Sequence, residues 1–556
     1  MEGACGQAIV QGLRAEGVEL VFGMLGNHLL SVYEVLGQDG GIRHITVNHE
    51  NHASLMALTY AQLTGRPGVC LTTAGPGAVN ALSGVAQAYD LATPLVHISG
   101  TVPLNSGRET FHGVDRPDFL CKMFQDVTKW SVRVERLSEF PDILSRAFAL
   151  ARGGRPGPVH IEIPQDVVDR PEALGPYRRE TLPVPPVDGA GLRAAQALLA
   201  DGRAPVICAG RGSVASGAAS LVVQWAEHLG APVVFPRDAI GVIPADHPLW
   251  GGMIIDGYFR RWFGNPAVDR LLQEADPLIV VGVRRRTPIW NYLQEFKPAR
   301  WVHVAYDEGD APAVPGVTLT GEIRGLVEAL LERTAGGRPH PGLRTVAEAR
   351  ARLRAGLDAF AAAQRDAVPV HFGYAMRELA PLLDREAIIV SGAGNSGVWA
   401  RSYLPALGPS HFFETGQWNA MGNELPMAIG AKLACPGRQV VSVAGDGSFL
   451  MACGEFGTAV QENAPIVVVI LNDGLHGMIA QMQEERYHTS RWTQIARCDF
   501  AALAESFGGV GIRVERPGEL REAFAKALGA GRPVIVDVLS APYPYPSFPE
   551  LMQQPS

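Results

Sequence analysis

The sequence predicts an α/β protein of three doubly wound domains, each a parallel sheet with helices on both faces. The chain has 556 residues, which is enough for about three or four domains of ordinary size. Short Val- and Ile-rich runs without clean polar alternation recur along it, separated by segments long enough for helices. Strands buried on both faces have this pattern, and they occur in parallel sheets covered by helices. Two stretches rich in proline, 171–189 and 334–342, divide the runs into three sets.

Each set of runs is taken as the strands of one domain, and the two proline-rich stretches as linkers. We therefore expect domains at 1–170, 190–333 and 350–545, with a surface helix over 346–365 leading into the third. The predicted strands are Leu20–Phe22, Ile42–Val47, Val69–Thr73, Leu95–Ser99 and Val159–Ile163 in the first domain; Val206–Ala209, Val233–Phe235, Leu278–Val281 and Val302–Val304 in the second; and Ile388–Val390, Val440–Ala444, Ile466–Leu471 and Val534–Val538 in the third.

Composition excludes several classes of protein. With 47% hydrophobic and 19% charged residues, the chain can bury full cores, so disorder is not expected. A net charge of −8 argues against a nucleic-acid or anionic-membrane surface. The seven cysteines are scattered without CxxC spacing, which argues against a disulfide framework or structural zinc and favours a reducing cytoplasm. No signal peptide and no apolar stretch of membrane-spanning length is recognised, so we expect a cytoplasmic enzyme.

The most informative motif is Gly-Asp-Gly-Ser at 445–448, directly after a predicted strand. The next strand ends in Asn472-Asp473-Gly474, and a helix over about 451–462 would connect the two. Because the carboxyl ends of parallel strands share one sheet edge, Asp446 and Asp473 are expected to lie together. Two oxygen side chains beside a glycine turn and a helix N-terminus suit Mg²⁺ bound with phosphate. Taken alone, an Asp in a glycine turn is most often only part of a turn.

This motif resembles the cofactor signature of the thiamine-diphosphate-dependent superfamily of acetolactate synthase, benzaldehyde lyase and pyruvate decarboxylase. Further blocks in the family's order extend the resemblance over nearly the whole chain. They are 18–26, 47–50, 74–77 and 157–164 in what resembles the pyrimidine-binding domain, and 420–431 ahead of the diphosphate motif. The resemblance implies that the three domains are the pyrimidine-binding, central and diphosphate-binding domains of that superfamily.

The resemblance also implies a set of cofactor and metal contacts. Asp446, Asp473 and the carbonyl of Leu475 would ligate Mg²⁺, with Ca²⁺ or Mn²⁺ as substitutes; this chain has Asp at 473 where the family most often has Asn. The other residues expected to contact thiamine diphosphate in this domain are Gly394, Asn395, Ser396, Asn419, Met421, Gly445, Gly447, Ser448, His476 and Met478.

Glu50 follows a predicted strand, where a carboxylate interacting with a helix dipole would be ordinary. In the family, the matching Glu is hydrogen-bonded to N1′ of the aminopyrimidine and favours the imino tautomer that removes the thiazolium C2 proton. Met421 matches the apolar residue that holds the cofactor bent, a proximity effect. The Asn419 carbonyl would accept from the 4′ amino group, although Asn replaces the usual Gly there.

Two histidines are expected on the substrate side. His28 aligns with an active-site histidine of benzaldehyde lyase, although a solvent-facing loop histidine is the alternative. His112 stands where acetolactate synthases and benzaldehyde lyase have Gln. Such a pair could shuttle protons near neutral pH, or favour a carboxylate when protonated. His476 and Met478 would shape the other wall, or Met478 would simply pack in the core.

The central domain carries a GxGxxA turn at 210–215, which alone is weak evidence for a dinucleotide. The family uses this domain for FAD in acetolactate synthases, for ADP in oxalyl-CoA decarboxylases, and leaves it empty in many other members. Arg284-Arg285-Arg286-Thr287 replaces the Arg-Phe-Asp-Asp run of acetolactate synthases. That departure argues against FAD and leaves arginines available for another phosphate.

The leading hypothesis is a thiamine-diphosphate- and Mg²⁺-dependent carboligase or lyase acting on 2-keto acids or acyloins, most similar in its motifs to acetolactate synthase. Benzaldehyde-lyase-like acyloin cleavage or ligation and simple 2-keto acid decarboxylation are the rivals within that class. A dinucleotide-dependent oxidoreductase and a non-catalytic relative are the alternatives outside it. Family architecture implies a homodimer or homotetramer, with Glu50 of one subunit facing Asp446 of another.

Overall fold

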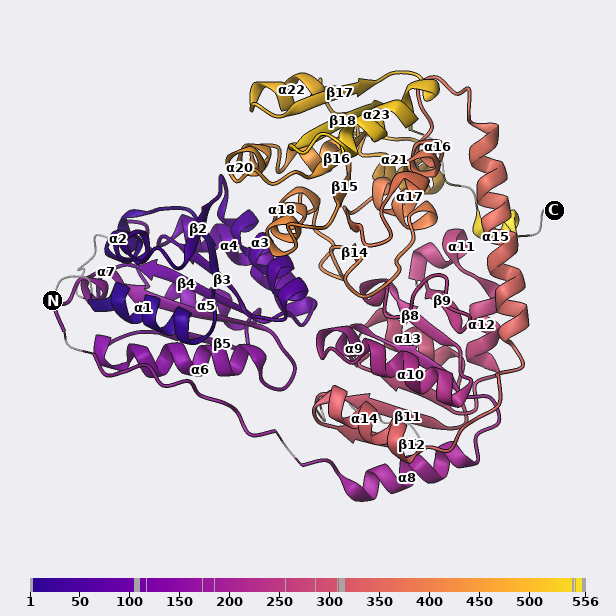
Figure 1. Ribbon diagram of the computed structural model, residues 1–556, viewed down its shortest axis with the longest axis horizontal. Coiled ribbons are helices and arrows are strands. Elements are labelled where there is room, and N and C mark those ends of the chain that lie inside the picture. Colours follow the sequence, from indigo (N-terminus) through magenta and orange to yellow (C-terminus); the bar gives the residue numbers. More distant parts are fainter. Residues whose placement is uncertain are drawn as a thin grey trace.

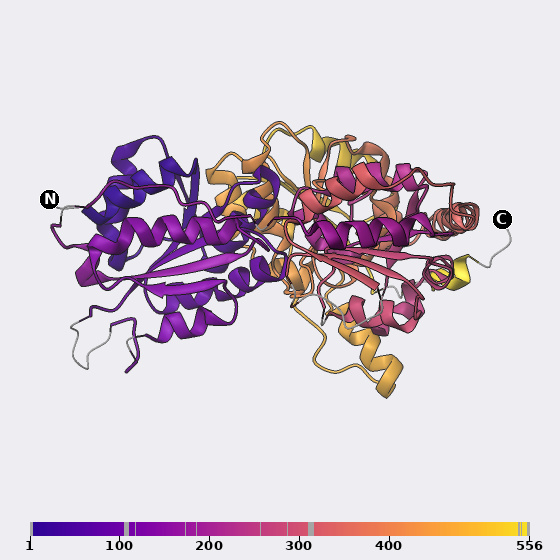
Figure 2. The same ribbon diagram turned by 90° about the horizontal axis from the view of Figure 1, so that it is seen from below.

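The computed structural model describes residues 4–104, 111–116, 118–172, 174–184, 186–255, 257–285, 287–307, 309, 316–542, 545 and 547–552. Its strands form three six-stranded sheets in which all paired strands run parallel, so the predicted fold class is confirmed. Figure 1 shows the three units as a triangle, and Figure 2 shows helices on both sides of the strands. None of the helices in the described ranges is long and apolar enough to cross a membrane.

The first sheet has the strand order β2-β1-β3-β4-β6-β5. Its strands are β1 (Leu20–Gly23), β2 (Arg43–Thr46), β3 (Gly68–Thr72), β4 (Leu95–Thr101), β5 (Trp130–Arg133) and β6 (Pro158–Pro164). Its helices are α1 (Ala4–Ala15), α2 (Leu30–Asp39), α3 (Glu50–Thr64), α4 (Pro76–Asp90), α5 (Phe119–Gln125), α6 (Phe140–Arg152) and α7 (Gln165–Val168).

The third sheet repeats this topology with the order β14-β13-β15-β16-β18-β17. Its strands are β13 (Ile388–Ser391), β14 (Phe412–Phe413), β15 (Val440–Gly445), β16 (Val467–Asn472), β17 (Val510–Val514) and β18 (Val534–Leu539). Its helices are α15 (Leu343–Ala363), α16 (Phe372–Leu379), α17 (Asn395–Tyr403), α18 (Glu424–Ala434), α19 (Asp446–Leu450), α20 (Glu455–Gln461), α21 (Gly477–Tyr487), α22 (Phe500–Ser506), α23 (Leu520–Leu528) and α24 (Phe548–Leu551).

The central sheet differs, with the order β12-β11-β10-β7-β8-β9. Counted from its own first strand, this is the order found in dinucleotide-binding folds. Its strands are β7 (Val206–Ala209), β8 (Val233–Pro236), β9 (Trp250–Ile254), β10 (Leu278–Val281), β11 (Trp301–Ala305) and β12 (Gly316–Thr320). Its helices are α8 (Gly189–Ala200), α9 (Arg211–Ala215), α10 (Ala219–Leu229), α11 (Arg260–Phe263), α12 (Pro266–Gln273), α13 (Pro288–Glu295) and α14 (Ile323–Arg333).

Every strand predicted from the sequence is present to within a residue or two at each end. The strands that the sequence did not reveal are β5, β9, β12, β14 and β17, and all five are edge strands. Edge strands are covered on fewer sides, so several of their residues are half-exposed and the apolar run that marks a buried strand is broken. The helix expected over about 451–462 is shorter, since α20 begins at Glu455 and a turn separates it from α19.

The first and third domains share one apolar core. A single cluster of buried side chains contains Phe22 and Leu55 of the first domain together with Leu425 and Phe456 of the third. Helices α3 and α18 pack directly, and a Cβ at Gly430 would lie 2.5 Å from the Met56 carbonyl oxygen, so glycine allows the close approach. We propose that the three domains span 1–170, 190–333 and 350–545. The long linker visible in Figure 1 joins the first two.

Candidate active site

The turns that follow β13, β14, β15 and β16 converge on one cavity of about 250 Å³ in the third domain. Ligands of open α/β sheets bind at this edge, outside the carboxyl ends of the strands. Every third-domain residue that the sequence nominated lines the cavity: Gly394, Asn395, Ser396, Asn419, Met421, Gly445, Asp446, Gly447, Ser448, Asp473, Leu475, His476 and Met478. The structure thus brings together residues that are up to 84 positions apart in the sequence.

The two carboxylates of this cavity lie side by side. Gly445 and Leu471 are register partners on β15 and β16, which places Asp446 and Asp473 just beyond adjacent strand ends. Asp446 accepts from the backbone N–H of Gly447 at 2.7 Å and of Gly474 at 2.6 Å, so its carboxylate joins the two turns. Burial and the neighbouring Asp446 charge raise the pKa of Asp473 to about 7, and burial raises that of Asp446. Paired buried carboxylates of this kind suit a divalent cation, which would offset both charges.

The same cavity contains unpartnered polar atoms beside the N-terminus of a helix. Asn395 Oδ1 and Ser396 Oγ are buried without a hydrogen-bond partner, at the N-terminus of the nine-residue helix α17. The first backbone N–H groups of a helix have no partner inside it, and the helix dipole favours negative charge there. Gly394 precedes the helix with a φ of +96°, a conformation that favours glycine. This corner therefore fits a diphosphate.

Asn419 adopts a left-handed backbone conformation with a φ of +51°. Asn is one of the few residues that tolerate this region, which explains how it can replace the usual Gly. Two residues on, Met421 lines the cavity, and the following N–H of Gly422 donates to Ser448 Oγ at 2.8 Å. The segment that carries Asn419 and Met421 is thus tied to the Gly-Asp-Gly-Ser turn.

The cavity also has walls that the sequence did not nominate as site residues. They are Phe372 at the start of α16, Ala393 after β13, Leu471 at the end of β16 and Gly477 at the start of α21; Ile479, which was expected on the substrate side, also lines the cavity. Phe372 lies outside any motif, so nothing in the sequence singles it out. Among the described residues no three His, Cys, Asp or Glu side chains gather as a metal site.

The first domain carries a second cluster, around Glu50. Glu50 is the first residue of α3 and is 6% exposed. Its Oε2 accepts from Asn80 Nδ2 at 3.0 Å, and a Cβ at Gly77 would approach its Oε1 to 3.0 Å. Asn80 was not among the predicted site residues, although its position one helical turn after the Gly75-Pro76-Gly77 turn could have identified it. The Glu50 carboxylate is therefore oriented by contacts with α4, and not only by the dipole of its own helix, α3.

His28 and His112 are neighbours at the same edge of the first sheet. Their ring centroids are 5.4 Å apart, and Phe111 stacks on His112 at 4.0 Å. His28 is 2% exposed, so it is not the solvent-facing loop histidine that was the alternative. Its Nδ1 lies 3.0 Å from Thr73 Oγ1. Burial, and then the neighbouring His112, lower the pKa of His28, so its ring is neutral at pH 7.

The two clusters do not meet within one chain. No first-domain residue in the part of the chain that the structure describes lines the third-domain cavity. Where the two domains do touch, Asn48 N and His52 Nδ1 both bond to Glu455 Oε1, at 2.8 and 2.9 Å, and Glu455 does not line the cavity. Each chain therefore presents two separate clusters of predicted site residues.

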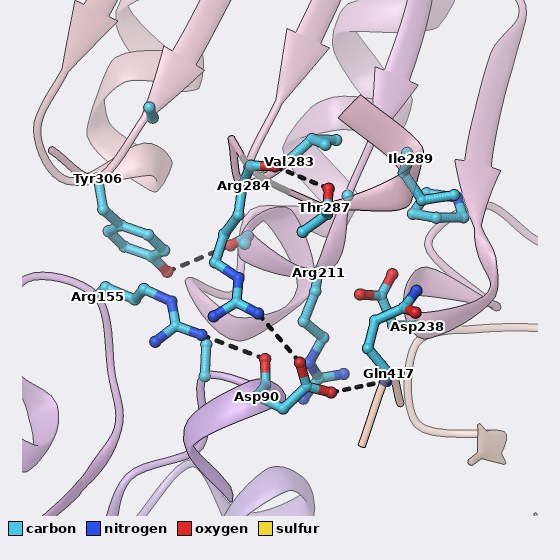
Figure 3. A pocket seen from close by; sticks show the side chains of 16 residues that line it. Asp90, Arg155, Arg211, Asp238, Val283, Arg284, Thr287, Ile289, Tyr306 and Gln417 are labelled. Carbon is cyan, nitrogen blue, oxygen red and sulfur yellow. Dashed lines mark hydrogen bonds and ion pairs between the residues drawn. The ribbon is translucent and has the colours of Figure 1, made fainter. Parts of the chain in front are cut away.

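A second pocket lies at the meeting point of all three domains, outside the carboxyl ends of β7 and β10 (Figure 3). This is the switch point of the central sheet, where dinucleotides bind in folds of this order. Charged side chains fill it: Asp90, Arg155, Arg211, Asp238 and Arg284 all line a cavity of only about 30 Å³.

These charges are largely engaged with the protein itself. Arg284 Nη2 donates to Asp90 Oδ1 at 3.1 Å, and Arg211 Nε donates to the Leu91 carbonyl at 2.8 Å. The GxGxxA glycines serve packing, because a Cβ at Gly210 or Gly212 would press on Gly282 of the neighbouring turn. Small-molecule sites span roughly 300–1,000 Å³, so this cavity of about 30 Å³ is small for one. Arg286 lies outside the described residues.

Known proteins resemble this chain along its whole length. The family models for the N-terminal, central and C-terminal domains of thiamine pyrophosphate enzymes match residues 4–119, 192–330 and 392–538. A probable acetolactate synthase large subunit of Methanocaldococcus jannaschii is 30% identical over 98% of this chain and 92% of its own. The large subunits of acetolactate synthase isozymes 3 and 2 of Escherichia coli are 31% and 32% identical, covering 96% and 97% of this chain and 94% and 95% of their own.

Thiamine pyrophosphate is another name for thiamine diphosphate, so the domain matches agree with the cofactor that the cavity fits. The chain is therefore an enzyme, and it belongs to the thiamine-diphosphate-dependent superfamily that contains the acetolactate synthases.

Proposed function

We propose that the protein is a Mg²⁺- and thiamine-diphosphate-dependent carboligase that acts on a 2-keto acid with loss of carbon dioxide. The observation that carries the proposal is the third-domain cavity, in which two buried carboxylates stand beside an unsatisfied anion cradle. The relatives that are named acetolactate synthases support the decarboxylative ligation of 2-keto acids over other reactions of this cofactor.

Asp446, Asp473 and the carbonyl of Leu475 would hold Mg²⁺, and the metal would in turn hold the diphosphate. Asn395, Ser396 and the N-terminus of α17 would take the diphosphate oxygens, with Gly445, Gly447 and Ser448 forming the opposite side. The unpartnered Ser396 hydroxyl, which can donate to a phosphate oxygen, supports this assignment, because buried polar groups normally have partners.

Thiamine diphosphate supplies, when bound, a nucleophilic thiazolium carbon and an electron sink for the carbonyl carbon of the substrate. Glu50 would exchange a proton with N1′ of the pyrimidine, and Asn80 would hold the Glu50 carboxylate in the required orientation. Met421 would support the bent cofactor from below, and the Asn419 carbonyl would accept from the 4′ amino group. The remaining cofactor wall would come from His476 and Met478.

His28 and His112 would face the substrate from the first domain. A neutral His28 ring, held by Thr73, can accept a proton from the substrate and then, as the imidazolium, return it. A neutral His28 would not attract a substrate carboxylate by charge. His112 keeps a buried Nδ1 without a partner, which supports a role as a hydrogen-bond donor or acceptor to substrate.

The complete site would form between two copies of the chain, in a homodimer or homotetramer. Glu50 lies outside the cavity that holds Asp446 in its own chain, so a partner subunit would supply it. We further propose a reducing cytoplasm as the location, since all seven cysteines are free, and no FAD, since the central pocket has no room for it.

A panel of 2-keto acids, assayed with thiamine diphosphate and Mg²⁺, tests the proposal. We expect one carbon dioxide released for each acyloin-type product formed. Carbon dioxide with free aldehyde would instead identify a simple decarboxylase. Cleavage of supplied acyloins without use of any 2-keto acid would identify a lyase of the benzaldehyde lyase type.

A further inference from the structure

Asp90 stands at the junction of the three domains and bonds to each of the other two. It is the last residue of α4, the helix that also carries Asn80. Its Oδ1 accepts from Arg284 of the central domain at 3.1 Å. Its Oδ2 accepts from two backbone N–H groups of the third domain: that of Gln417 at 2.7 Å, drawn in Figure 3, and that of Trp418 at 3.2 Å. Its side chain is 12% exposed, so water screens these bonds little.

The backbone that Asp90 holds leads straight to the cofactor cavity. Gln417 and Trp418 immediately precede Asn419, and Met421 follows two residues later. Asp90 and Ser448 thus anchor opposite ends of one short segment, Ser448 by accepting from the Gly422 N–H at 2.8 Å. Between these anchors lie the left-handed residue Asn419 and the methionine that lines the cavity.

Other contacts place the segment against the same junction. Gly416 has a φ of +64°, and a Cβ there would lie 2.6 Å from Asp90 Oδ2, so the backbone passes directly over the carboxylate. The Gly416 carbonyl accepts from Arg237 Nη2 of the central domain at 2.6 Å. Trp418 Nε1 donates to Ser83 Oγ, on the same helix as Asp90, at 3.0 Å.

We propose that Asp90 is a positioning residue for catalysis: it fixes the 416–422 segment so that the Asn419 carbonyl and Met421 meet the cofactor in one geometry. This inference rests on the proposed function, which gives those two residues their roles. Charge-assisted hydrogen bonds are about twice as strong as neutral ones, so a carboxylate suits this anchoring task. Arg284 balances the charge of Asp90 and holds the carboxylate in place.

Removal of the carboxylate leaves the Gln417 and Trp418 N–H groups without their acceptor and lets the segment sample other positions. The misplacement of a reacting group by about 1 Å can cost about a hundredfold in rate. Asp90→Ala should therefore slow the exchange of the thiazolium C2 hydrogen for deuterium by about ten- to a hundredfold per bound cofactor. Asp90→Asn keeps one acceptor oxygen, so its C2 exchange rate should lie between those of Asp90→Ala and the wild type.

The test combines two readouts at matched cofactor occupancy. The first is C2 hydrogen exchange of bound thiamine diphosphate, followed by NMR after acid quench, which needs no substrate. The second is amide hydrogen exchange of a peptide spanning 414–422 in the cofactor-free protein, which should become faster in Asp90→Ala. Gly416→Ala disturbs the same contact from the other partner and should reproduce both effects. Asp238→Asn alters another carboxyl that lines the same pocket, whose buried Oδ1 has no hydrogen-bond partner, and it should change neither.

The outcomes separate this inference from the function on which it rests. Slower C2 exchange together with faster amide exchange, in Asp90→Ala and Gly416→Ala but not in Asp238→Asn, supports the inference. A wild-type enzyme that does not accelerate C2 exchange over free cofactor would overturn the proposed function and the inference with it. Acceleration in the wild type that Asp90→Ala leaves within about twofold would overturn the inference alone.

Discussion

The third-domain cavity and the central pocket occupy equivalent places, at the carboxyl ends of parallel strands beside glycine turns, yet they differ in how their polar groups are satisfied. The third-domain cavity measures about 250 Å³ and leaves Asn395 Oδ1 and Ser396 Oγ unpartnered. The central pocket measures about 30 Å³; there Arg284 pairs with Asp90, although Asp238 Oδ1 lacks a partner. The sheet edge marks where a ligand can bind, whereas room and unsatisfied polar groups mark where one does.

The largest expected effect comes from the other half of the proposed site. Glu50→Gln keeps the shape of the side chain but removes its ability to exchange a proton with the cofactor. Proton transfer by a positioned side chain contributes about 10²–10⁴-fold, and C2 hydrogen exchange of bound cofactor should fall by about that factor. Cofactor affinity should change little, since the diphosphate and metal are held elsewhere. Exchange at the wild-type rate with saturating cofactor would show that Glu50 has no part in cofactor activation.

The next effect breaks the third-domain cavity itself. Asp446→Asn removes one of two carboxylate charges, and hydrogen bonds or contacts to charged groups contribute about 1.5–3 kcal/mol, or about ten- to a hundredfold in affinity. Thiamine diphosphate, titrated at fixed Mg²⁺ by tryptophan fluorescence, should bind more weakly by that factor, and raised Mg²⁺ should restore part of the loss. Arg284→Met in the central pocket is the matched control, and equal weakening in both variants would contradict the distinction between the two pockets.

A smaller effect concerns unpartnered polar atoms that lie outside the two pockets. Glu162 on β6 has both carboxylate oxygens buried without a hydrogen-bond partner, but it lines none of the described pockets. Arg133, its register partner on β5, is 3.6 Å away, and burial outweighs this charge and raises the pKa of Glu162 to about 7. We interpret Glu162 as a cost in stability rather than a binding group.

The sign of the pH dependence follows from that pKa. The unfolded chain loses the Glu162 proton near pH 4.5 and the folded chain only near pH 7, so the folded protein holds the extra proton in between. Stability should therefore fall as the pH rises from 4.5 through 7, by about 3 kcal/mol at most from this residue. Glu162→Gln should remove this fall, which urea unfolding at pH 5 and pH 8 measures. The same pH dependence in wild type and variant would exclude Glu162 as its source.

The smallest expected effect concerns the central pocket. The purified protein should carry no flavin absorbance, and added FAD should leave its thermal unfolding midpoint unchanged, because paired charges occupy the space that the ring system needs. A ligand present at 100 times its dissociation constant would add about 2.7 kcal/mol. A clear rise in the midpoint with FAD would show that Arg284 and Asp90 move apart to admit it.

The sequence predicts the interior of this fold better than its margins. Central strands such as β16 are buried on both faces and leave continuous apolar runs, whereas edge strands such as β5 and β12 are half-exposed and leave none. The third-domain site was predictable because Asp446 and Asp473 each follow a recognisable strand. Asp90 was not, since its partners Arg284 and Gln417 are 194 and 327 residues away, and nothing in the sequence links either of them to Asp90. Only the packing of three domains brings them together.

The most direct test of the account is whether one site is built from two chains. Glu50→Gln and Asp446→Asn proteins are unfolded together or co-expressed to allow mixed dimers, and C2 hydrogen exchange is assayed at a limiting thiamine diphosphate and Mg²⁺ concentration at which neither variant is active alone. If the partner subunit supplies Glu50, each mixed dimer has one intact site, and random pairing restores about a quarter of the wild-type rate. Pairing either variant with the Glu50→Gln, Asp446→Asn double variant should restore none. Mixed dimers that form but stay inactive would contradict the account, because each chain would then have to build its site alone.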